Sequence, residues 1–392
     1  MNLDIMLIVF MLALLAWVWL FFLWQRRAIL SPPGQKALTD YPSLSVIRPI
    51  KGLDAGLEDN IRAGFEHGYP GPLETLFVFD DDQEPGVALV RKVMEERRQS
   101  GRSDDARILF SGQPPSNRTG KLNAMIVGLQ ASHHELIAFV DSDIRQDAED
   151  LRILVTTLLS DERIGAAFPT VVSTATPRTL GDVGYALMIN GLYEPAALAT
   201  ARQSDDTLPF IMGHMMVLRR EAIQAMGGLE DVEGQLVDDM YIGRRFNDVG
   251  YLNKLSPKAA AIIQQDSSVE EFVGILIRWI AFSMSGLPFW STKLPHWLSG
   301  TALWVGLLVA PVALIQGDLL TGGLALLLPL SVMVTMNRLH FLMAGAPIPL
   351  KYFWGSLLIW LSAPLIYGQI WFKREVNWRG RRYRLNLRST LG

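Results

Sequence analysis

Two aspartates, Asp141 and Asp143, follow the apolar run LIAFV at residues 136–140 and are separated by one serine. Carboxylates at this spacing can hold a hard divalent cation, which can in turn hold a phosphate. The alternative is that Asp and Ser after a strand only form a turn or cap the next helix, because these residues favour such positions. The triplet alone leaves both interpretations open.

A second acidic cluster follows another apolar run, LETLFVF at residues 73–79; it consists of Asp80, Asp81, Asp82, Gln83 and Glu84. Ligands of parallel α/β sheets bind outside the carboxyl ends of the strands, so both clusters could face one cleft. Like charges repel, and Mg²⁺ or Mn²⁺ completed by phosphate oxygens would relieve that repulsion. The sequence contains no G-x-G-x-x-G or G-x-x-x-x-G-K-[ST] loop, which weakens dinucleotide and P-loop interpretations.

A third acidic group, the pair Asp238 and Asp239, directly precedes the amphipathic segment MYIGRRFNDVG at residues 240–250. The pair could act as a helix cap that interacts favourably with the helix dipole. It could equally supply a carboxylate to the cleft.

The elements that must position these acids alternate between strands and helices. Short β-rich runs are expected at 44–50, 73–79 and 136–140, with helical patterns between them at 56–68, 86–101 and 120–132. This alternation predicts βαβ units and an α/β domain with a mainly parallel sheet. SPPGQ at 31–35 is typical of a linker into that domain.

Composition narrows the class of protein. The 392 residues carry a formal net charge of −3, so no overall basic field indicates nucleic-acid binding. The chain has no cysteine, which excludes disulfides, thiolate metal sites and a cysteine nucleophile. The mean hydropathy of +0.21 is high for a soluble protein.

Membrane anchors explain this hydropathy. Residues 5–24 are twenty uncharged apolar positions, enough to cross ~30 Å of hydrocarbon as a helix. A cleaved signal peptide would have a shorter apolar run with its basic residues in front, whereas here Arg26 and Arg27 follow. We therefore expect a retained anchor with the following chain in the cytoplasm.

Three further apolar stretches lie at 297–315, 319–336 and 352–372. QGD at 316–318 predicts a tight turn between the first two, and the strongly basic tail after the third is expected to be cytoplasmic. Four full spans would place that tail outside. Pro364 and Gly368 permit a kinked or re-entrant third stretch, and counting spans leaves the topology open.

Taken in order, the motifs resemble those of family 2-type GT-A membrane glycosyltransferases, specifically the ceramide glucosyltransferase-like branch, to which bacterial hopanoid-associated lipid glycosyltransferases are similar. The resemblance covers nearly the whole chain and rests on SVIRPIKGLD (45–54), DDDQEPG (80–86), RTGKLNAM (118–125), VDSDIR (140–145), GHMMVLRREAIQAMGGL (213–229), VDDMYIGRR (237–245), IRW (277–279) and WRGRRYRL (378–385).

The resemblance implies residue roles. Asp239 corresponds to the general base, and Asp143 with Asp141 corresponds to the metal-binding D-x-D. Nucleotide-sugar contacts would come from Asp81, Asp82, Glu84, Lys121, Asn123 and Asp141, although the family usually has Asp at the position of Glu84. The acceptor and diphosphate region would include Asp238, Arg278 and Trp279, with Ile275 departing from the first position of the [Q/R]-x-x-R-W motif. A snorkelling arginine beside a membrane-surface tryptophan is the alternative for that last pair.

These roles imply an inverting glycosyltransferase that moves a hexose or N-acetylhexosamine from a UDP-sugar to a membrane lipid hydroxyl of ceramide, hopanoid or diacylglycerol type. A divalent cation, Mg²⁺ or Mn²⁺, would neutralise the leaving UDP. A processive polysaccharide synthase is the alternative enzyme, disfavoured by Ile275 and the few spans. A non-catalytic membrane scaffold with a retained GT-A fold is the alternative of another class.

The expected organisation is an integral multi-pass protein of the bacterial inner membrane with its catalytic domain on the cytoplasmic face. The expected segments are an anchor (1–27), a linker (28–43), a GT-A domain (44–270), an interfacial amphipathic segment (271–292), membrane spans (293–372) and a basic cytoplasmic tail (373–392).

Overall fold

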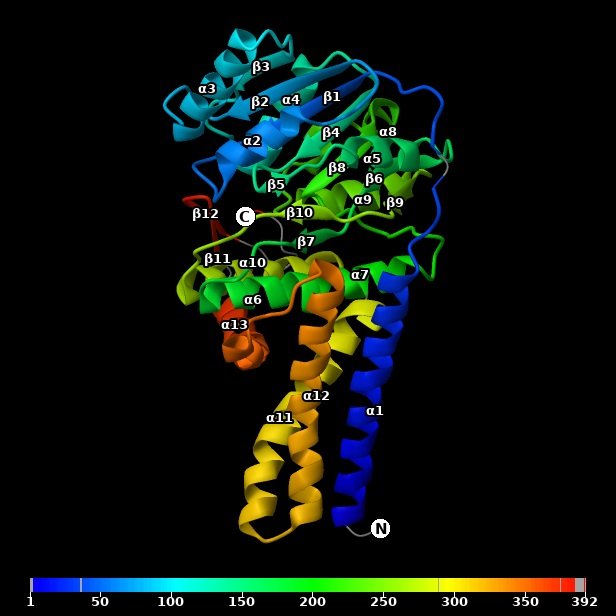
Figure 1. Cartoon of the computed structure of the whole chain (residues 1–392), viewed down its shortest axis with the longest axis vertical. Coiled ribbons are helices and arrows are strands. Elements are labelled where there is room, and N and C mark those ends of the chain that lie inside the picture. The colour runs from blue at the N-terminus through cyan, green and yellow to red at the C-terminus, as the bar shows by residue number, and fades with distance from the viewer. Residues whose placement is uncertain (1–2, 36, 288, 374, 385–390, 392) are drawn as a thin grey trace.

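The computed structural model describes residues 3–35, 37–287, 289–373, 375–384 and 391. An α/β domain forms one end of the molecule and a bundle of long helices forms the other (Figure 1). The chain enters the domain from the first bundle helix, and Leu391 near its other end lies against the domain.

A seven-stranded sheet in the order β3-β2-β1-β4-β8-β6-β9 organises the domain. Strands β3, β2, β1 and β4 are parallel, β8 is antiparallel to both of its neighbours, and β9 is parallel to β6. The predicted mainly parallel sheet is thus confirmed. The strands are β1 Leu44–Pro49, β2 Leu73–Phe79, β3 Asp105–Phe110, β4 Leu136–Val140, β6 Ile164–Phe168, β8 Met215–Arg219 and β9 Leu252–Leu255.

Helices and a small second sheet surround these strands. The expected helices occur as α2 Leu57–Phe65, α3 Pro85–Gln99 and α4 Gly120–Ala131, followed by α5 Asp150–Leu158, α8 Arg220–Ala225, the 3₁₀ turn Leu229–Val232 and α9 Asp238–Asp248. The second sheet pairs β5 Ile144–Arg145, β10 Ala260–Ile262 and β7 Val171–Ser173 in the order β5-β10-β7. It lies below the main sheet, toward the bundle (Figure 1).

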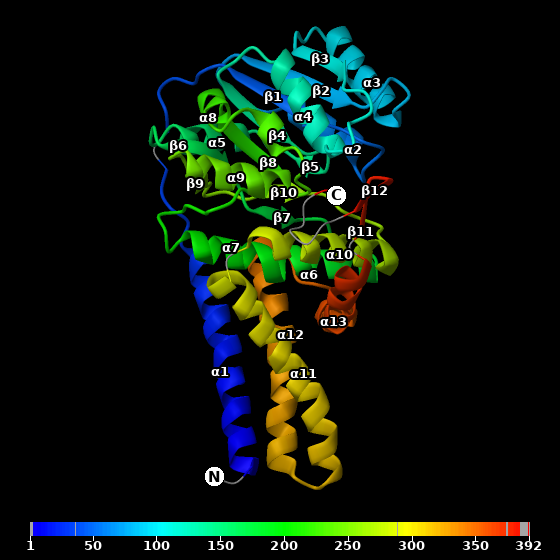
Figure 2. The same cartoon turned by 180° about the vertical axis from the view of Figure 1, so that it is seen from behind.

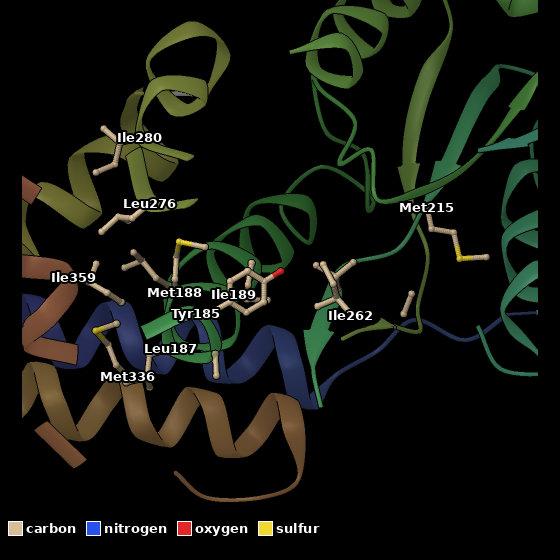
Figure 3. Packing of buried hydrophobic residues seen from close by; sticks show 14 of the residues in the cluster. Tyr185, Leu187, Met188, Ile189, Met215, Ile262, Leu276, Ile280, Met336 and Ile359 are labelled. Carbon is tan, nitrogen blue, oxygen red and sulfur yellow. The ribbon is translucent and has the colours of Figure 1, made fainter. Parts of the chain in front are cut away.

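A layer of helices forms the foot of the domain: α6 Leu180–Met188, the π-turn Ile189–Tyr193, α7 Glu194–Ala201 and α10 Val269–Gly286. Ser268 and Glu271 form a capping box that starts α10. The close-up in Figure 3 shows the buried cluster that joins this layer to the bundle, with Tyr185, Leu187, Met188, Leu276, Ile280, Met336 and Ile359 among its members.

Among the residues that the structure describes, four helices are long and apolar enough to cross a membrane. They are α1 Leu3–Leu30, α11 Leu294–Ile315 after the turn Phe289–Lys293, α12 Leu319–Ala344, and α13 Ser356–Lys373 after the turn Leu350–Gly355. Helices α1, α11 and α12 pack side by side along the long axis. Helix α13 is seen nearly end-on in Figures 1 and 2, so it lies across the foot instead.

This arrangement removes the conflict that arose from counting spans. Helices α11 and α12 run away from the domain and back, joined at the predicted turn, where Gly317 has a left-handed φ of 79° and Asp318 caps α12. The chain then crosses the foot in α13 and stays on the side of the domain. There it forms the hairpin of β11 Glu375–Trp378 and β12 Arg381–Arg384.

Candidate active site

The carboxyl ends of β1, β2 and β4 meet at a cavity of about 540 Å³, a size ordinary for ligand sites. The predicted residues that line it come from four regions: Asp141 and Asp143 after β4, Lys121 in the first turn of α4, Asp238 and Asp239 at the start of α9, and Arg278 and Trp279 in α10. Acids that lie almost a hundred residues apart in the sequence therefore share one cavity.

The loop after β4 is held from both sides. The Asp141 backbone N–H donates to the carbonyl of His214 at 2.8 Å, and the carbonyl of Asp143 accepts from the Ile263 N–H at 2.9 Å. Beneath the loop, the buried guanidinium of Arg48 donates to the Ile144 carbonyl at 3.2 Å. These bonds fix the direction in which the two aspartate side chains project.

Lys121 is the direct charge partner of Asp141. Its Nζ lies 2.7 Å from one carboxylate oxygen and 2.9 Å from the other, and it also donates to the Gly213 carbonyl at 3.0 Å. Burial by itself would lower the pKa of Lys121, but Asp141, Asp238 and Asp239 together raise it. Lys121 is therefore a fixed positive charge.

Asp143 has a different environment. Its Oδ1 is buried without a hydrogen-bond partner among the described residues. Burial, together with nearby Asp141 and Asp54, raises the pKa of Asp143 to about 7. A buried oxygen with no donor, next to two other acids, suits a divalent cation. Within the described part of the chain no three acidic or histidine side chains cluster as a metal-binding group, so phosphate oxygens would have to complete the shell.

Asp239 lies at the start of α9 with both carboxylate oxygens held by backbone N–H groups. Oδ2 accepts from Gly213 at 2.6 Å and Oδ1 accepts from Met240 at 2.8 Å. Gly213 permits this approach, because a Cβ at that position would lie 2.5 Å from the Cβ of Asp239. Burial and neighbouring Asp238 raise the pKa of Asp239 to about 7, which suits a group that accepts a proton near neutral pH.

The wall nearest the foot is aromatic. Trp279 stacks on His214 with ring centroids 5.7 Å apart and lies 5.0 Å from the ring of Tyr193. The guanidinium of Arg278 lies 5.8 Å from the centroid of Trp378 in the C-terminal hairpin. Ile275, the departure from the family motif, lines the same wall.

Four predicted nucleotide residues do not line the cavity. Asp81 and Asp82 are exposed in the turn after β2. Glu84 is buried, precedes α3, and forms an ion pair with Lys51. Asn123 is buried in α4, where its side-chain amide donates to the Ser111 carbonyl at 3.0 Å. Asp81 and Asp82 therefore face solvent, while Glu84 and Asn123 form local contacts. The geometry does not support direct nucleotide contacts from these four side chains.

The cavity is also lined by residues to which the motifs assigned no individual role: Lys51, Asp54, Asp80, Tyr185, Glu194, His214, Arg379, Arg381 and Tyr383. Asp80 is the first acid after β2 and lies 2.7 Å from Lys51. The position of Asp80 directly after the strand was the sequence signal that could have placed it in the cavity. Glu194, whose buried Oε1 has no hydrogen-bond partner among the described residues, had no local signal.

Sequence comparisons relate the chain to known glycosyltransferases. The protein-family model described as Glycosyl transferase family 21 matches residues 6–391. Ceramide glucosyltransferase 3 of Caenorhabditis elegans is 25% identical over 249 residues, covering 63% of this chain and 52% of that protein. The probable glycosyltransferase YdaM of Bacillus subtilis is 22% identical over 256 residues, covering 63% of this chain and 57% of that protein. The chain thus spans about half the length of these relatives.

A solved structure shows the same fold. The mannosyltransferase PcManGT of Pyrobaculum calidifontis, determined with GDP-Man and Mn²⁺, has a TM-score of 0.51 and 17% sequence identity. The match covers 94% of this chain and all of that one. The expected GT-A-like α/β domain with apolar helices at both ends is confirmed.

Proposed function

Because the chain belongs to glycosyl transferase family 21, we propose that it is a hexosyltransferase that moves a hexose or N-acetylhexosamine from a UDP-sugar to the hydroxyl of a membrane lipid, with inversion at the anomeric carbon. The observation that carries the proposal is that Lys121, Asp141, Asp143 and Asp239 line one cavity. Tyr185, Tyr193 and Trp279 of the foot layer line the same cavity.

A divalent cation, Mg²⁺ or Mn²⁺, fits the donor end of this cavity. Asp143 would hold it together with Asp141, because the Oδ1 of Asp143 is buried and lacks a donor among the described residues. When bound, the cation would stabilise negative charge on the departing nucleoside diphosphate. The presence of Mn²⁺ in the PcManGT structure supports this choice of cofactor.

Asp239 is the proposed general base. Its carboxylate would accept the proton of the lipid hydroxyl while that oxygen attacks the sugar on the face opposite the nucleotide. The two backbone N–H bonds orient the carboxylate, and no described side-chain cation lies at hydrogen-bond distance from it. The raised pKa favours proton uptake. Lys121, bonded to Asp141, keeps the neighbouring charge in place.

The acceptor is proposed to be a lipid alcohol of ceramide, hopanoid or diacylglycerol type. The aromatic wall of Trp279 and Tyr193 belongs to the foot layer, into which α1, α11 and α12 lead. A hydroxyl at the membrane surface could reach the cavity along this wall. The names of the ceramide glucosyltransferase relatives support this acceptor class.

We also propose that the domain lies on the cytoplasmic face of a bacterial inner membrane. Arg26 and Arg27 lie in the last part of α1, at the domain end, where the positive-inside rule places cytoplasmic residues. The out-and-back path of α11 and α12 keeps the C-terminal hairpin on the same side, as the basic composition of the tail requires.

The test incubates the purified protein with UDP-glucose, UDP-galactose or UDP-N-acetylglucosamine, Mn²⁺ and a panel of lipids, and identifies products by mass spectrometry. Asp239→Asn should lower turnover by about 10²–10⁴-fold while UDP binding persists. Full activity of that variant would contradict the role of Asp239. Long polymeric products would favour a processive synthase, and failure to bind any nucleotide sugar would favour a scaffold.

A further inference from the structure

The C-terminal hairpin β11–β12 forms part of the cavity wall, although its basic composition predicted only a cytoplasmic tail. Arg379, Arg381 and Tyr383 line the cavity. Arg382 and Arg384, the alternate residues of the strand, are exposed. In β12 the side chains alternate, so Arg381 and Tyr383 face the cavity while Arg382 and Arg384 face solvent. Arg379 reaches the cavity from the turn between the two strands and completes the inward row.

Both inward arginines pair with acids of the cavity. Arg379 donates to Asp54 at 3.0 Å through Nη2. The Nη2 of Arg381 donates to Asp80 at 2.8 Å and to the side chain of Gln113 at 3.1 Å. Gly120, at the start of α4, leaves room for Arg381, since a Cβ there would overlap the Nη1 of that arginine.

These ion pairs are replaceable, because each acid has a second partner. Asp80 also contacts Lys51 at 2.7 Å, and Asp54 also accepts a hydrogen bond from Ser142. If the arginines turned away, Asp80 would keep its ion pair with Lys51 and Asp54 would keep its hydrogen bond from Ser142. Neither carboxylate would lose its last hydrogen-bond partner, which is a large part of the cost of breaking such a pair. The arginines are therefore free to exchange a carboxylate for a stronger anion.

The excess of acidic groups around the cavity would favour such an exchange when a nucleotide binds. Among the described residues, eight carboxyl groups line the cavity against five cations: Asp54, Asp80, Asp141, Asp143, Glu194, Asp238, Asp239 and Glu271 against Lys51, Lys121, Arg278, Arg379 and Arg381. A diphosphate would add further negative charge. Two of the five cations belong to the hairpin, and the guanidinium fork suits phosphate oxygens.

We propose that Arg379 and Arg381 bind the diphosphate of the donor, and that the hairpin thereby clamps the bound nucleotide and loosens when the nucleoside diphosphate leaves. This inference rests on the proposed function, since it assumes that the donor occupies this cavity. It assigns the inward row to the donor and leaves the outward row, Arg382 and Arg384, without a role in donor binding.

The experiment measures UDP affinity in the presence of Mn²⁺ by calorimetry, with the full chain in nanodiscs of zwitterionic lipid. R379Q/R381Q should bind UDP about 10- to 100-fold more weakly, because two charge-assisted hydrogen-bonding groups are lost. R382Q/R384Q is the matched control, with the same charge change in the same hairpin, and should stay within about twofold of wild type. Gly120→Ala should weaken binding to an intermediate extent by displacing the Arg381 guanidinium.

Limited trypsin digestion gives a second readout, because the hairpin carries its own cleavage sites. UDP with Mn²⁺ should slow cleavage after Arg382 and Arg384 in wild type, and it should not do so in R379Q/R381Q. If that variant is cleaved faster without nucleotide but binds UDP like wild type, the arginines only secure the hairpin to Asp54 and Asp80, and the inference is refuted.

Two further outcomes are distinguishable. An affinity loss that appears only in nanodiscs containing anionic lipid would mean that the arginines recognise headgroup phosphates, and would overturn the assignment to the donor. Absence of UDP binding by the wild-type protein would refute the proposed function together with this inference. Normal wild-type binding with an unchanged R379Q/R381Q affinity would refute the inference alone.

Discussion

Asp238→Asn should make the enzyme more active at low pH, although it removes a carboxylate from the cavity. Burial and Asp238 raise the pKa of Asp239 to about 7, while Lys121 and the N–H groups of Gly213 and Met240 oppose this rise. At pH 6 about a tenth of Asp239 would then be ionised and able to act as a base. Removing the neighbouring negative charge should lower that pKa.

The size of the effect follows from the titration. A like charge nearby displaces a pKa by about one pH unit or more. The midpoint of the acid limb should therefore move from about pH 7 to about pH 6, which raises the ionised fraction at pH 6 about fivefold. The amide keeps an oxygen that can accept the 2.9 Å hydrogen bond from the Asp239 N–H, so the local backbone should persist.

The assay is kcat/KM against pH between 5 and 9, with each variant normalised to its own alkaline plateau. Asp248→Asn, at the exposed end of the same helix, is the matched control and should leave the limb in place. An acid limb in Asp238→Asn that stays where it is in wild type, or moves to higher pH, would refute the assignment of Asp239 as the titrating base.

The remaining predictions concern the cation site, the glycine beside the base and the buried arginine. Asp143→Asn should weaken Mn²⁺-dependent UDP binding about tenfold or more, measured by calorimetry with and without Mn²⁺. Equal UDP affinity of the wild-type protein with and without the metal would contradict this prediction. Gly213→Ala should lower kcat at least ~10-fold with UDP affinity retained, because a methyl group would lie 2.5 Å from the Asp239 Cβ; wild-type kcat would argue against the close approach. Arg48→Met should destabilise the domain by about 3 kcal/mol or more, seen as a lower Tm, because buried acceptors at Asn60, Ile144 and Gln146 lose their donor.

Local sequence patterns were sufficient for three strands, the helices between them and the long apolar helices. The runs at 44–50, 73–79 and 136–140 became β1, β2 and β4 within one residue, because short β-rich runs between helical patterns specify buried strands. The family resemblance implied that Asp141 and Asp239 belong to one site, and both line the same cavity. Strands β3, β6, β8 and β9 were not predicted.

Which residue after β2 lines the cavity could not be predicted from the sequence, for a physical reason. Five polar residues follow that strand, and local spacing cannot tell which one the turn will direct inward. The pairing of Asp80 with Lys51 and Arg381 decides it, and Arg381 lies 301 residues away. Glu84 is instead drawn to Lys51 at the start of α3.

Hydropathy and charge determined that the chain carries apolar helices and a basic C-terminus, because these are properties of consecutive residues. Only the tertiary structure decided that α13 crosses the foot and that the basic residues divide into a cavity row and a solvent row. The direction of a helix and the orientation of a hairpin depend on contacts with elements that are distant in the sequence. Helix α13 packs against α6 and α10, and the hairpin pairs with the loops after β1 and β2. Those contacts exist only once the domain has folded.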